Sequence, residues 1–542
     1  MMSFVRASLV LSFVATVGLA GCAAISSPEG GVRDKTPPQL VRSIPANGAR
    51  NVQGQSVRLE FSEQVQVKDL PKNLIVAPLL REDNPYKLRE ERNSVTLQFE
   101  KPFEPNTTYS FNFGEAISDI TESNVAPKAV VSFSTGARLD SGSVRGAVTD
   151  LLTGQPAAAA SVVLYPEIDT ANIRRGRPYY LARTDKAGSF SLQNLKEGRY
   201  QVFALADKNQ NNRYDEGERV AYLPELVTIR PGLDSVQLRL TRPDARRPLV
   251  TTQKPGPTEF LVSYNEGLTQ AQVLPLGATT APPALAEAAV LTDKGRTVAL
   301  YRTPALTEGR YLLAATDSAG NVGRDTVAVR FQGNAQARRG PAYTVDGSPR
   351  EVYRQGQVRF LFTEPVRLAA PNKPLGTLVE DSVKRRPLRI PQEASLSPDR
   401  RTLSVELNTP ARRSVSILLD STVLQSVTGQ SLGLRPLRLR VTDQATTGTL
   451  SGPISTRYTR YELQLLDASG QVQASLINPK GTYRFNHLAP GTYRLRVLID
   501  ANQDGRWQNG DPQLRRPAEP VYFLPKPLEI RANWDQVEAL QF

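Results

Sequence analysis

Two acidic loops of this 542-residue chain carry oxygen-bearing side chains at the spacing of a calcium site. Alternate side chains of a tightly wound loop can point at one cation, and position 7 contributes its backbone carbonyl. The sequence therefore predicts two Ca²⁺ sites, although Asn/Asp-rich hairpins that cap their own backbone have a similar composition. At positions 1, 3, 5, 7, 9 and 12 the first loop has Asp207, Asn209, Asn211, Arg213, Asp215 and Glu218, and the second has Asp500, Asn502, Asp504, Arg506, Gln508 and Asp511.

The two loops depart from the ideal pattern in different ways. Position 6 is the favoured glycine, Gly505, in the second loop and Asn212 in the first, and asparagine also tolerates the left-handed backbone conformation. Gln508 and the short Asp511 are weak ligands at positions 9 and 12 of the second loop. Because a strand enters each loop where an EF-hand has a helix, we expect a structural clip that stiffens the loop.

The residue types for nucleophilic and zinc chemistry are almost absent. The chain has one histidine, His487, and one cysteine, Cys22, so Ser-His-Asp triads, Cys-His pairs and histidine-rich zinc sites are nearly excluded. His487 is predicted to lie in a turn between two strands. Paired carboxylates could still support hydrolysis, and Glu63, Asp119 and Glu364 are candidates, but we expect them to serve in turns or hydrogen bonds.

Residues 1–21 have the composition of an export signal. Arg6 precedes an apolar stretch, residues 7–20, that is too short to span a bilayer permanently. The sequence LAGC at residues 19–22 resembles a bacterial lipobox, which implies cleavage before Cys22 and acylation of that residue. Ala23 follows where an aspartate would favour the inner membrane, so the resemblance implies lipid anchoring at the outer membrane or cell surface. An ordinary signal peptide with a chance cysteine is the alternative.

The charge balance is basic, with 67 Lys and Arg against 53 Asp and Glu, a formal net charge of +14. The basic residues occur in small groups without interleaved aromatic residues, which argues against nucleic acid as a partner. Anionic lipids, phosphates or acidic glycans would be attracted non-specifically. A solvated basic surface without a specific acidic ligand is the preferred interpretation.

Each loop belongs to a longer repeat. Residues 188–218 recur without a gap at 481–511, an offset of 293 (481 − 188), and both copies contain the pattern Leu-x-x-Gly-x-Tyr. Residues 57–65 recur at 358–366 and residues 222–230 at 523–531, each at an offset of 301 (358 − 57 and 523 − 222). The three matches indicate that a two-domain unit is duplicated.

Short alternating segments punctuated by 37 Gly and 41 Pro predict an all-β chain without long helices. The segments TPPQLVRSIPANGARNV, VRLEFSEQV and VVSFST resemble the bacterial Ig-like domain of S-layer and surface proteins, and EGRYLLAATDSAGNVGRDTVAVRF resembles the end of such a domain. The segment GSFSLQNLKEGRYQV resembles the carboxypeptidase-regulatory-like, or prealbumin-like, sandwich. In that family the Gly, Phe and Tyr positions are structural and carry no chemistry.

We therefore expect a rod of tandem Ig-like and prealbumin-like antiparallel β-sandwiches. The expected segments are the lipoprotein signal peptide (1–21), a flexible tether (22–35), an Ig-like domain (36–138), a regulatory-like sandwich (139–242), an Ig-like spacer (243–335), a second Ig-like domain (336–443) and a second regulatory-like sandwich (444–542).

Three functions fit this organisation. The first is a non-enzymatic, lipid-anchored surface protein with a structural, adhesive or display role, stabilised by Ca²⁺. The second is a component of an outer-membrane surface complex that binds a surface glycan or an envelope protein through loops at the sandwich tips. The third and most remote is a carboxylate-based hydrolase. Fold alone does not choose among them.

Overall fold

The computed structural model describes residues 33–542, with the exception of 128, 169–171, 334–341 and 512. The predicted signal peptide and Cys22 therefore lie outside the described residues. The described chain confirms the all-β prediction, since its helices are limited to α2 (Leu70–Asn73), α3 (Pro283–Ala286) and the 3-10 turn η1 (Asp293–Gly295). None of these described helices is long and apolar enough to cross a membrane.

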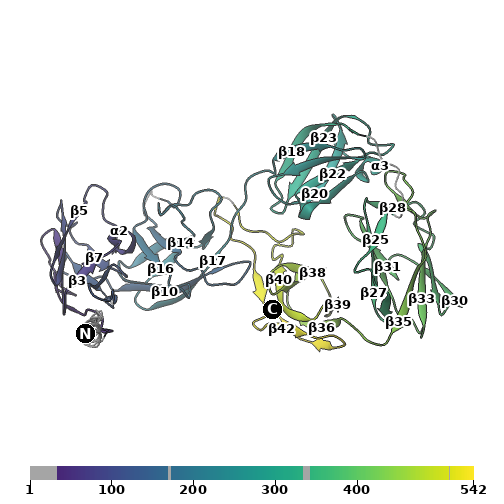
Figure 1. The fold of residues 1–542 in the computed structure, drawn as a ribbon. Coiled ribbons are helices and arrows are strands. Elements are labelled where there is room, and N and C mark those ends of the chain that lie inside the picture. Colours follow the sequence, from purple (N-terminus) through teal and green to yellow (C-terminus); the bar gives the residue numbers. More distant parts are fainter. Residues whose placement is uncertain (1–32, 128, 169–171, 334–341, 512) are drawn as a thin grey trace, which may run out of the picture.

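The strands group along the chain into five units, numbered 1 to 5 here, and each unit buries its own apolar cluster (Figure 1). The exact domain boundaries stay a prediction. Unit 1 packs the sheet β1-β2-β6-β5 against β4-β7-β9, with the pair β3-β8 at one side. Its strands are β1 (Leu40–Ile44), β2 (Ser56–Phe61), β3 (Val65–Val67), β4 (Ile75–Ala77), β5 (Tyr86–Glu91), β6 (Ser94–Phe99), β7 (Thr108–Asn112), β8 (Ile117–Asp119) and β9 (Val130–Ser134).

Alternation along the strands of unit 1 places large aromatic side chains in its core. In β6, Val95, Leu97 and Phe99 point inward and are almost fully buried. Phe111 lies between Phe99 and Phe133, with ring centroids 5.9 Å apart in both pairs. Such aromatic pairs add about 1 kcal/mol each beyond the area that they bury.

Units 2 and 5 share one topology, as the repeat predicts. In unit 2 the sheets are β13-β10-β17 and β12-β11-β14-β15 with β16 on β14; in unit 5 they are β39-β36-β43 with β44 on β36, and β38-β37-β40-β41 with β42 on β40. The strands of unit 2 are β10 (Gly142–Asp150), β11 (Ser161–Pro166), β12 (Tyr180–Arg183), β13 (Ser189–Leu195), β14 (Gly198–Leu205), β15 (Val220–Tyr222), β16 (Val227–Ile229) and β17 (Leu233–Leu240). Those of unit 5 are β36 (Gly448–Ser455), β37 (Tyr461–Asp467), β38 (Val472–Ile477), β39 (Thr482–Leu488), β40 (Gly491–Ile499), β41 (Val521–Phe523), β42 (Leu528–Ile530), β43 (Asp535–Val537) and β44 (Leu540–Gln541).

Two strands on opposite sheets close unit 2. The chain turns between them at Gly232, where φ is +71°, and changes sheets. β16 pairs with β14, and β17 pairs in parallel with β10 on the opposite sheet. A left-handed turn at glycine costs little, so the chain can cross from one layer of the sandwich to the other within three residues.

Unit 3 is a sandwich of the sheets β18-β19-β22-β21 and β20-β23-β24. Its strands are β18 (Val250–Pro255), β19 (Glu259–Tyr264), β20 (Leu268–Pro275), β21 (Ala289–Thr292), β22 (Thr297–Tyr301), β23 (Gly309–Asp317) and β24 (Val322–Val329).

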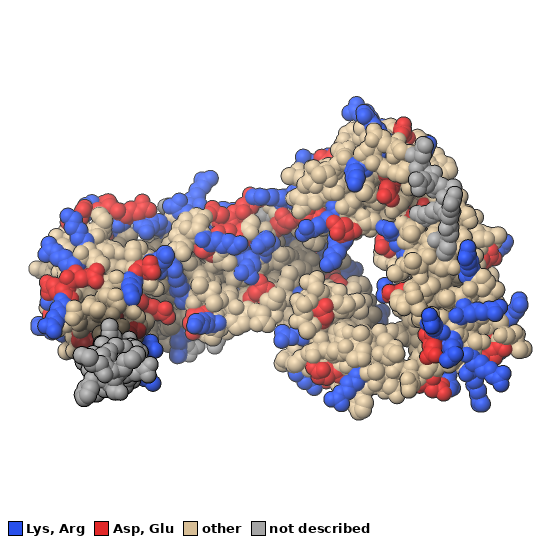
Figure 2. Space-filling model, in the orientation of Figure 1, with Lys and Arg blue, Asp and Glu red and all other residues tan. Residues whose placement is uncertain are grey.

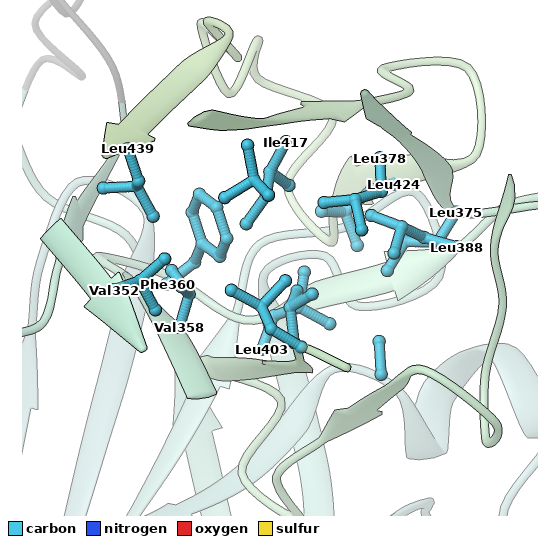
Figure 3. Packing of buried hydrophobic residues seen from close by; sticks show 14 of the residues in the cluster. Val352, Val358, Phe360, Leu375, Leu378, Leu388, Leu403, Ile417, Leu424 and Leu439 are labelled. Carbon is cyan, nitrogen blue, oxygen red and sulfur yellow. The ribbon is translucent and has the colours of Figure 1, made fainter. Parts of the chain in front are cut away.

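Unit 4 packs β25-β27-β32-β31 against β26-β35-β33-β29-β30, with the pair β28-β34 beside them. Phe360 and Leu403 from the first sheet point into the same layer as Ile417 and Leu439 from the second (Figure 3). The strands are β25 (Tyr343–Val345), β26 (Glu351–Tyr353), β27 (Gln357–Phe362), β28 (Val366–Leu368), β29 (Gly376–Glu380), β30 (Lys384–Leu388), β31 (Ala394–Leu396), β32 (Thr402–Glu406), β33 (Ser414–Leu419), β34 (Leu424–Ser426) and β35 (Leu437–Thr442).

The larger sheet of unit 2 is apolar on both faces. Along β11, Val162 and Leu164 belong to the sandwich core, whereas Val163 and Tyr165 belong to a second cluster on the opposite face, and all four are fully buried. A continuous apolar run is typical of a strand that is covered on both sides. The second cluster is covered from three directions, by Leu79 of unit 1, Tyr214 of the first acidic loop and Leu514 of unit 5.

Unit 5 packs against unit 2, although about 300 residues separate their equivalent positions in the chain. Leu151 of unit 2 is buried with Leu498 and Val521 of unit 5, and Trp507 and Phe523 of unit 5 pack around them. Hydrogen bonds cross the same contact, from Arg496 Nη1 to the Leu152 carbonyl (2.6 Å), from Asn509 Nδ2 to the Arg242 carbonyl (2.8 Å) and from Thr241 Oγ1 to the Asn509 carbonyl (3.0 Å).

The expected rod is therefore wrong, because the chain folds back on itself. Figure 1 shows β40 of unit 5 returning to the end of unit 2, and Figure 2 shows units 3, 4 and 5 around an opening. Strand patterns specify each sandwich but not the angles between sandwiches. Those angles depend on side chains such as Leu151 and Leu498 that meet only in the folded chain.

The contact between units 2 and 5 predicts that Leu498→Asp opens the molecule without unfolding it. The substitution removes about 2 kcal/mol of apolar burial and places a charge in the contact. Small-angle X-ray scattering should show a larger radius of gyration. Ile477→Asp on β38, which β37 separates from β40 in the same sheet, is the control: its side chain is 68% exposed, and the radius should be unchanged. An unchanged radius for Leu498→Asp would show that this contact does not hold the fold-back.

Candidate functional site

The first acidic loop winds around the carboxylate of Asp207. Its Oδ1 and Oδ2 accept hydrogen bonds from the backbone N–H groups of Asn211 (3.2 Å) and Asn212 (2.8 Å). Asn209 Nδ2 and Asn211 Nδ2 both donate to Asp215 Oδ2, at 2.7 and 2.9 Å. The loop thus brings together the predicted ligands at positions 1, 3, 5 and 9.

Of the two remaining predicted ligands of the first loop, Glu218 joins the cluster and Arg213 does not. Glu218 Oε1 and Oε2 accept from the N–H groups of Lys208 (3.4 Å) and Asp215 (3.3 Å), so position 12 closes the loop. The side chain of Arg213 points away, and its Nε donates to the Gly176 carbonyl (3.1 Å). Asn212 adopts the left-handed conformation expected at position 6, with φ of +55°.

The second loop repeats the first at its start. Asp500 is 6% exposed, and its two oxygens accept from the N–H groups of Asp504 (3.1 Å) and Gly505 (2.8 Å). Asn502 Nδ2 donates to Asp504 Oδ2 (3.1 Å), and Gln508 Nε2 donates to the same oxygen. Gly505 occupies position 6 with φ of +103°, a conformation that side chains rarely adopt.

Position 12 of the second loop is where the structure departs from the sequence prediction. Asp511 does not close this loop: its Oδ1 and Oδ2 accept from the N–H groups of Arg515 (3.1 Å) and Arg516 (2.7 Å) in a separate turn. The carboxylate that closes the loop is Glu519. Its Oε1 accepts from the N–H groups of Ala501 (2.8 Å) and Asn502 (3.0 Å), and its Oε2 from Gln508 (2.8 Å).

The two repeat offsets contain the signal that identifies Glu519. Asp511 aligns with Glu218 at the offset of 293, whereas Glu519 aligns with Glu218 at 301 (519 − 218), the offset of the strand that follows. The second copy is therefore eight residues longer (301 − 293) between Gln508 and Glu519. An ungapped match carried past Gln508 misses the eight extra residues and assigns position 12 to the wrong carboxylate.

Glu519 and Asp500 form a buried acidic pair. Glu519 is 8% exposed, and burial raises its pKa; hydrogen bonds from backbone N–H groups oppose this rise, and the charge of Asp500 adds to it. Two buried carboxylates repel each other strongly unless a cation or a proton neutralises part of their charge. The loop thus has the anionic, oxygen-rich character that suits a hard divalent cation.

The second loop also faces unit 3. The guanidinium of Arg506 lies directly over Gly320, in the turn after β23, where a Cβ atom would collide with it. The turn itself is capped by Asp317, which is 1% exposed and accepts from Asn321 N and Nδ2, both at 2.9 Å. Arg506 therefore contacts the neighbouring unit through its side chain.

Three carboxylates meet beside this turn: Asp244 from the segment that joins units 2 and 3, and Glu266 and Asp317 of unit 3, with one oxygen of each within 4.8 Å of the others. Burial and repulsion by Asp244 and Asp317 raise the pKa of Glu266 to about 7. The sequence gives no sign of this cluster, because its members come together only through tertiary folding.

The three carboxylates considered for hydrolysis lie at turns. Asp119 is 1% exposed, and its oxygens accept from the N–H groups of Glu122 (2.8 Å) and Ser123 (2.7 Å) and from Asn124 Nδ2 (2.7 Å). Glu364 Oε2 accepts from Thr428 Oγ1 (2.6 Å). Burial raises the pKa of Glu63, and nearby acidic residues, Asp34 first, add to the rise. Asp119 and Glu364 thus have the hydrogen-bonding role that we expect from the sequence.

His487 does not lie in a turn, contrary to the prediction. It belongs to β39, at a β-bulge opposite β36, and its φ is +56°, equal to that of Asn194 in the first copy. Its Nε2 lies 2.7 Å from Glu406 Oε2 of unit 4. Bulges re-aim the side chain that they carry. The only histidine of the sequence therefore links two units.

Comparison with known proteins supports the fold assignment of unit 1. Residues 34–135 match the family described as Bacterial Ig-like domain, which confirms the resemblance for this part of the chain. No curated protein matches the chain.

Three solved structures illustrate the more distant likenesses. The Bacillus anthracis TIE protein is 10% identical over 95% of this chain and 76% of its own, with a TM-score of 0.14. The S-layer protein rSbsC(31-844) is 12% identical over 90% and 66%, with a TM-score of 0.14. The Bacteroides ovatus glucan-utilisation protein SGBP-B, in complex with a mixed-linkage heptasaccharide, is 10% identical over 73% and 95%, with a TM-score of 0.17. TM-scores this far below 0.5 carry no argument about this chain.

The geometry sharpens the calcium prediction. Saturating Ca²⁺ should raise the melting temperature, since binding at 10 to 100 times Kd stabilises the folded state by about 1 to 3 kcal/mol. Glu519→Gln should remove the contribution of the second loop, as should Asp500→Ala, because each deletes a carboxylate charge from it. Asp511→Asn is the matched control and should leave the Ca²⁺ shift intact. Loss of the shift in Asp511→Asn but not in Glu519→Gln would restore the original assignment.

The raised pKa of Glu266 predicts a pH dependence of stability. A carboxyl whose pKa is higher in the folded than in the unfolded chain stabilises the fold when protonated, and this contribution is lost as pH rises from 4.5 through about 7. Thermal melts at pH 5, 6, 7 and 8 should show that the melting temperature falls as the pH rises, and Glu266→Gln should make this fall smaller. An equal fall of the melting temperature in the wild type and in Glu266→Gln would show that Glu266 does not cause the pH dependence.

Proposed function

We propose that this chain is a non-enzymatic, lipid-anchored protein of the bacterial outer membrane or cell surface. Its role is structural, adhesive or for display, and Ca²⁺ bound at the two acidic loops stiffens it. Acylated Cys22 holds the chain in the membrane, since two or more acyl chains anchor a protein stably. The five sandwiches then form the exported body, and the Ig-like match at residues 34–135 agrees with a surface protein.

The observation that carries this proposal is the packing of unit 5 on unit 2. Leu151, Leu498 and Val521 bury an apolar contact between units that are far apart in the chain. Such a contact fixes the relative positions of sandwiches that short linkers alone would leave mobile. A body of fixed shape is what a spacer or display scaffold requires.

The use of the acidic side chains also favours a non-enzymatic role. The buried candidates for acid-base chemistry are Asp119, whose carboxylate caps the turn that follows it, and Glu364, whose Oε2 accepts a hydrogen bond from Thr428. A general acid or base must instead reach a substrate proton. The remote hypothesis of a hydrolase gains no support from the geometry of these residues.

The distribution of charge supports a solvated surface. On the face in Figure 2, Lys and Arg side chains are interspersed with Asp and Glu side chains and form no continuous basic groove. Mixed charges of this kind keep a protein soluble and weaken long-range attraction to polyanions. This face accordingly offers no basic groove for nucleic acid.

Anchoring is tested by Cys22→Ala, which should release the protein from the membrane fraction because it removes the acylated side chain. Ala23→Asp is the matched variant: it keeps the lipid but should move the protein to the inner membrane. Fractionation on a sucrose gradient with immunoblotting measures both. Cys22→Ala protein that still sediments with the outer membrane would contradict lipid anchoring.

A further inference from the structure

The duplicated unit places a cleft at the same position in each copy. The first lies between units 1 and 2, has a volume of about 700 Å³ and is lined in part by Gln193 and Asn194. The second lies between units 4 and 5, has a volume of about 400 Å³ and is lined by the equivalent Asn486 and His487 (486 − 193 = 293). Both volumes lie within the range of small-molecule sites.

Only the second cleft has an aromatic wall. Trp534 lines it and is 57% exposed, whereas Leu233 occupies the equivalent position of the first copy (534 − 301) and does not line the first cleft. An indole that leaves more than half of its surface in water forgoes apolar burial that is worth about 2 kcal/mol. A ligand that covers the ring would recover this energy.

The backbone holds Trp534 rigidly. The Trp534 carbonyl accepts from Thr449 N (3.0 Å) of β36, and the N–H of the preceding residue, Asn533, donates to the Thr447 carbonyl (3.0 Å). Asn533 has a φ of +55° and precedes the start of β43. The ring is therefore presented from a fixed β-sheet edge, which lowers the entropy lost on binding.

Hydrogen-bonding side chains from both units line the cleft together with Trp534. Arg484 Nε donates to Asn486 Oδ1 (2.8 Å), and Arg484 Nη2 lies 3.8 Å from Asp535 Oδ1. Gln355 and Asn408 of unit 4 also line the cleft. Amides, a carboxylate and a guanidinium together offer donors and acceptors over a span of several ångströms.

The charges in the cleft compensate one another. Arg484 lies beside Asp535, and His487 Nε2 lies 2.7 Å from Glu406 Oε2, where its hydrogen bond lowers the pKa of that carboxyl. A site for an anion would carry uncompensated basic residues. The cleft therefore suits a neutral ligand that combines an apolar face with many hydroxyl groups.

A pyranose ring has this chemistry, since its C–H groups form an apolar face and its hydroxyls project around the rim. We propose that the cleft between units 4 and 5 binds a neutral oligosaccharide, with one pyranose stacked on Trp534 and its hydroxyls bonded to Arg484, Asn486 and Asp535. This site goes beyond the scaffold role and gives the displayed body a ligand. The first cleft has no aromatic residue among those that line it, so we do not expect it to bind the sugar.

Binding can be measured on the full chain with cellohexaose, maltohexaose and chitohexaose as probes. Trp507→Phe leaves Trp534 as the only tryptophan, so a sugar that stacks on it should change the fluorescence. Isothermal calorimetry on the wild type should give a Kd of about 1 mM or lower for at least one hexaose. No binding of any of the three at this level overturns the proposal.

Variants locate the site. Trp534→Ala should weaken binding at least tenfold, and Asn486→Ala should weaken it several-fold because it removes an acceptor of Arg484. Gln193→Ala, the equivalent change in the first cleft, should have no effect. Melting temperatures check that each variant is folded. Because Trp534 is largely exposed, Trp534→Ala should melt at nearly the same temperature as the wild type. If binding survives Trp534→Ala, or if Gln193→Ala abolishes it, the sugar binds elsewhere and the proposal is overturned. Membrane fractionation of Cys22→Ala tests lipid anchoring separately.

Discussion

The sheet of unit 2 that is apolar on both faces is the constraint on which the arrangement of the chain depends. A sandwich needs only one apolar face per sheet, so Val163 and Tyr165 on the second face must be covered by something outside the sandwich. The covering groups come from unit 1, from the first acidic loop and from unit 5. The corresponding face in unit 5 is mixed: Gln464 and Arg496 hydrogen-bond to each other there at 2.6 and 2.8 Å, and Leu498 and Val521 form an apolar part that unit 2 covers. Both copies therefore need a neighbour on this face, and the apolar part is larger in the first.

The acidic loops show how one pattern serves two purposes. Asp207 and Asp500 cap their own loops through backbone N–H groups, and this is what an Asn/Asp-rich hairpin would do without a metal. The same winding gathers side-chain oxygens in one place, and in the second loop it buries Asp500 with Glu519. Hairpin capping and the proposed binding of Ca²⁺ thus depend on the same side chains. The loop must be wound before its oxygens can converge.

Strand patterns predict much of the fold, since alternation, turn residues and the repeat identify the sandwiches and their equivalence. The same reasoning also finds most of the loop residues, because their spacing is local. It misses Glu519, which an insertion separates from the motif, and Glu266, whose acidic neighbours Asp244 and Asp317 lie at distant positions in the chain. It places His487 in a turn because a bulge looks like one in sequence. It also predicts a rod, because a linear pattern holds no information about which outer surfaces are complementary.

The fold-back joins two homologous modules through largely different surfaces. Unit 2 contributes the turn after β10, around Leu151, whereas unit 5 contributes the outer side of β40 and β41, around Leu498 and Val521. Such a contact is heterologous, because two different surfaces meet in it, and closure within one chain covers both of them. A closed chain is therefore self-terminated. A chain that opened at this contact would expose both surfaces, and each would match the other surface of a second open chain, so closure covers within one molecule what two molecules would otherwise share.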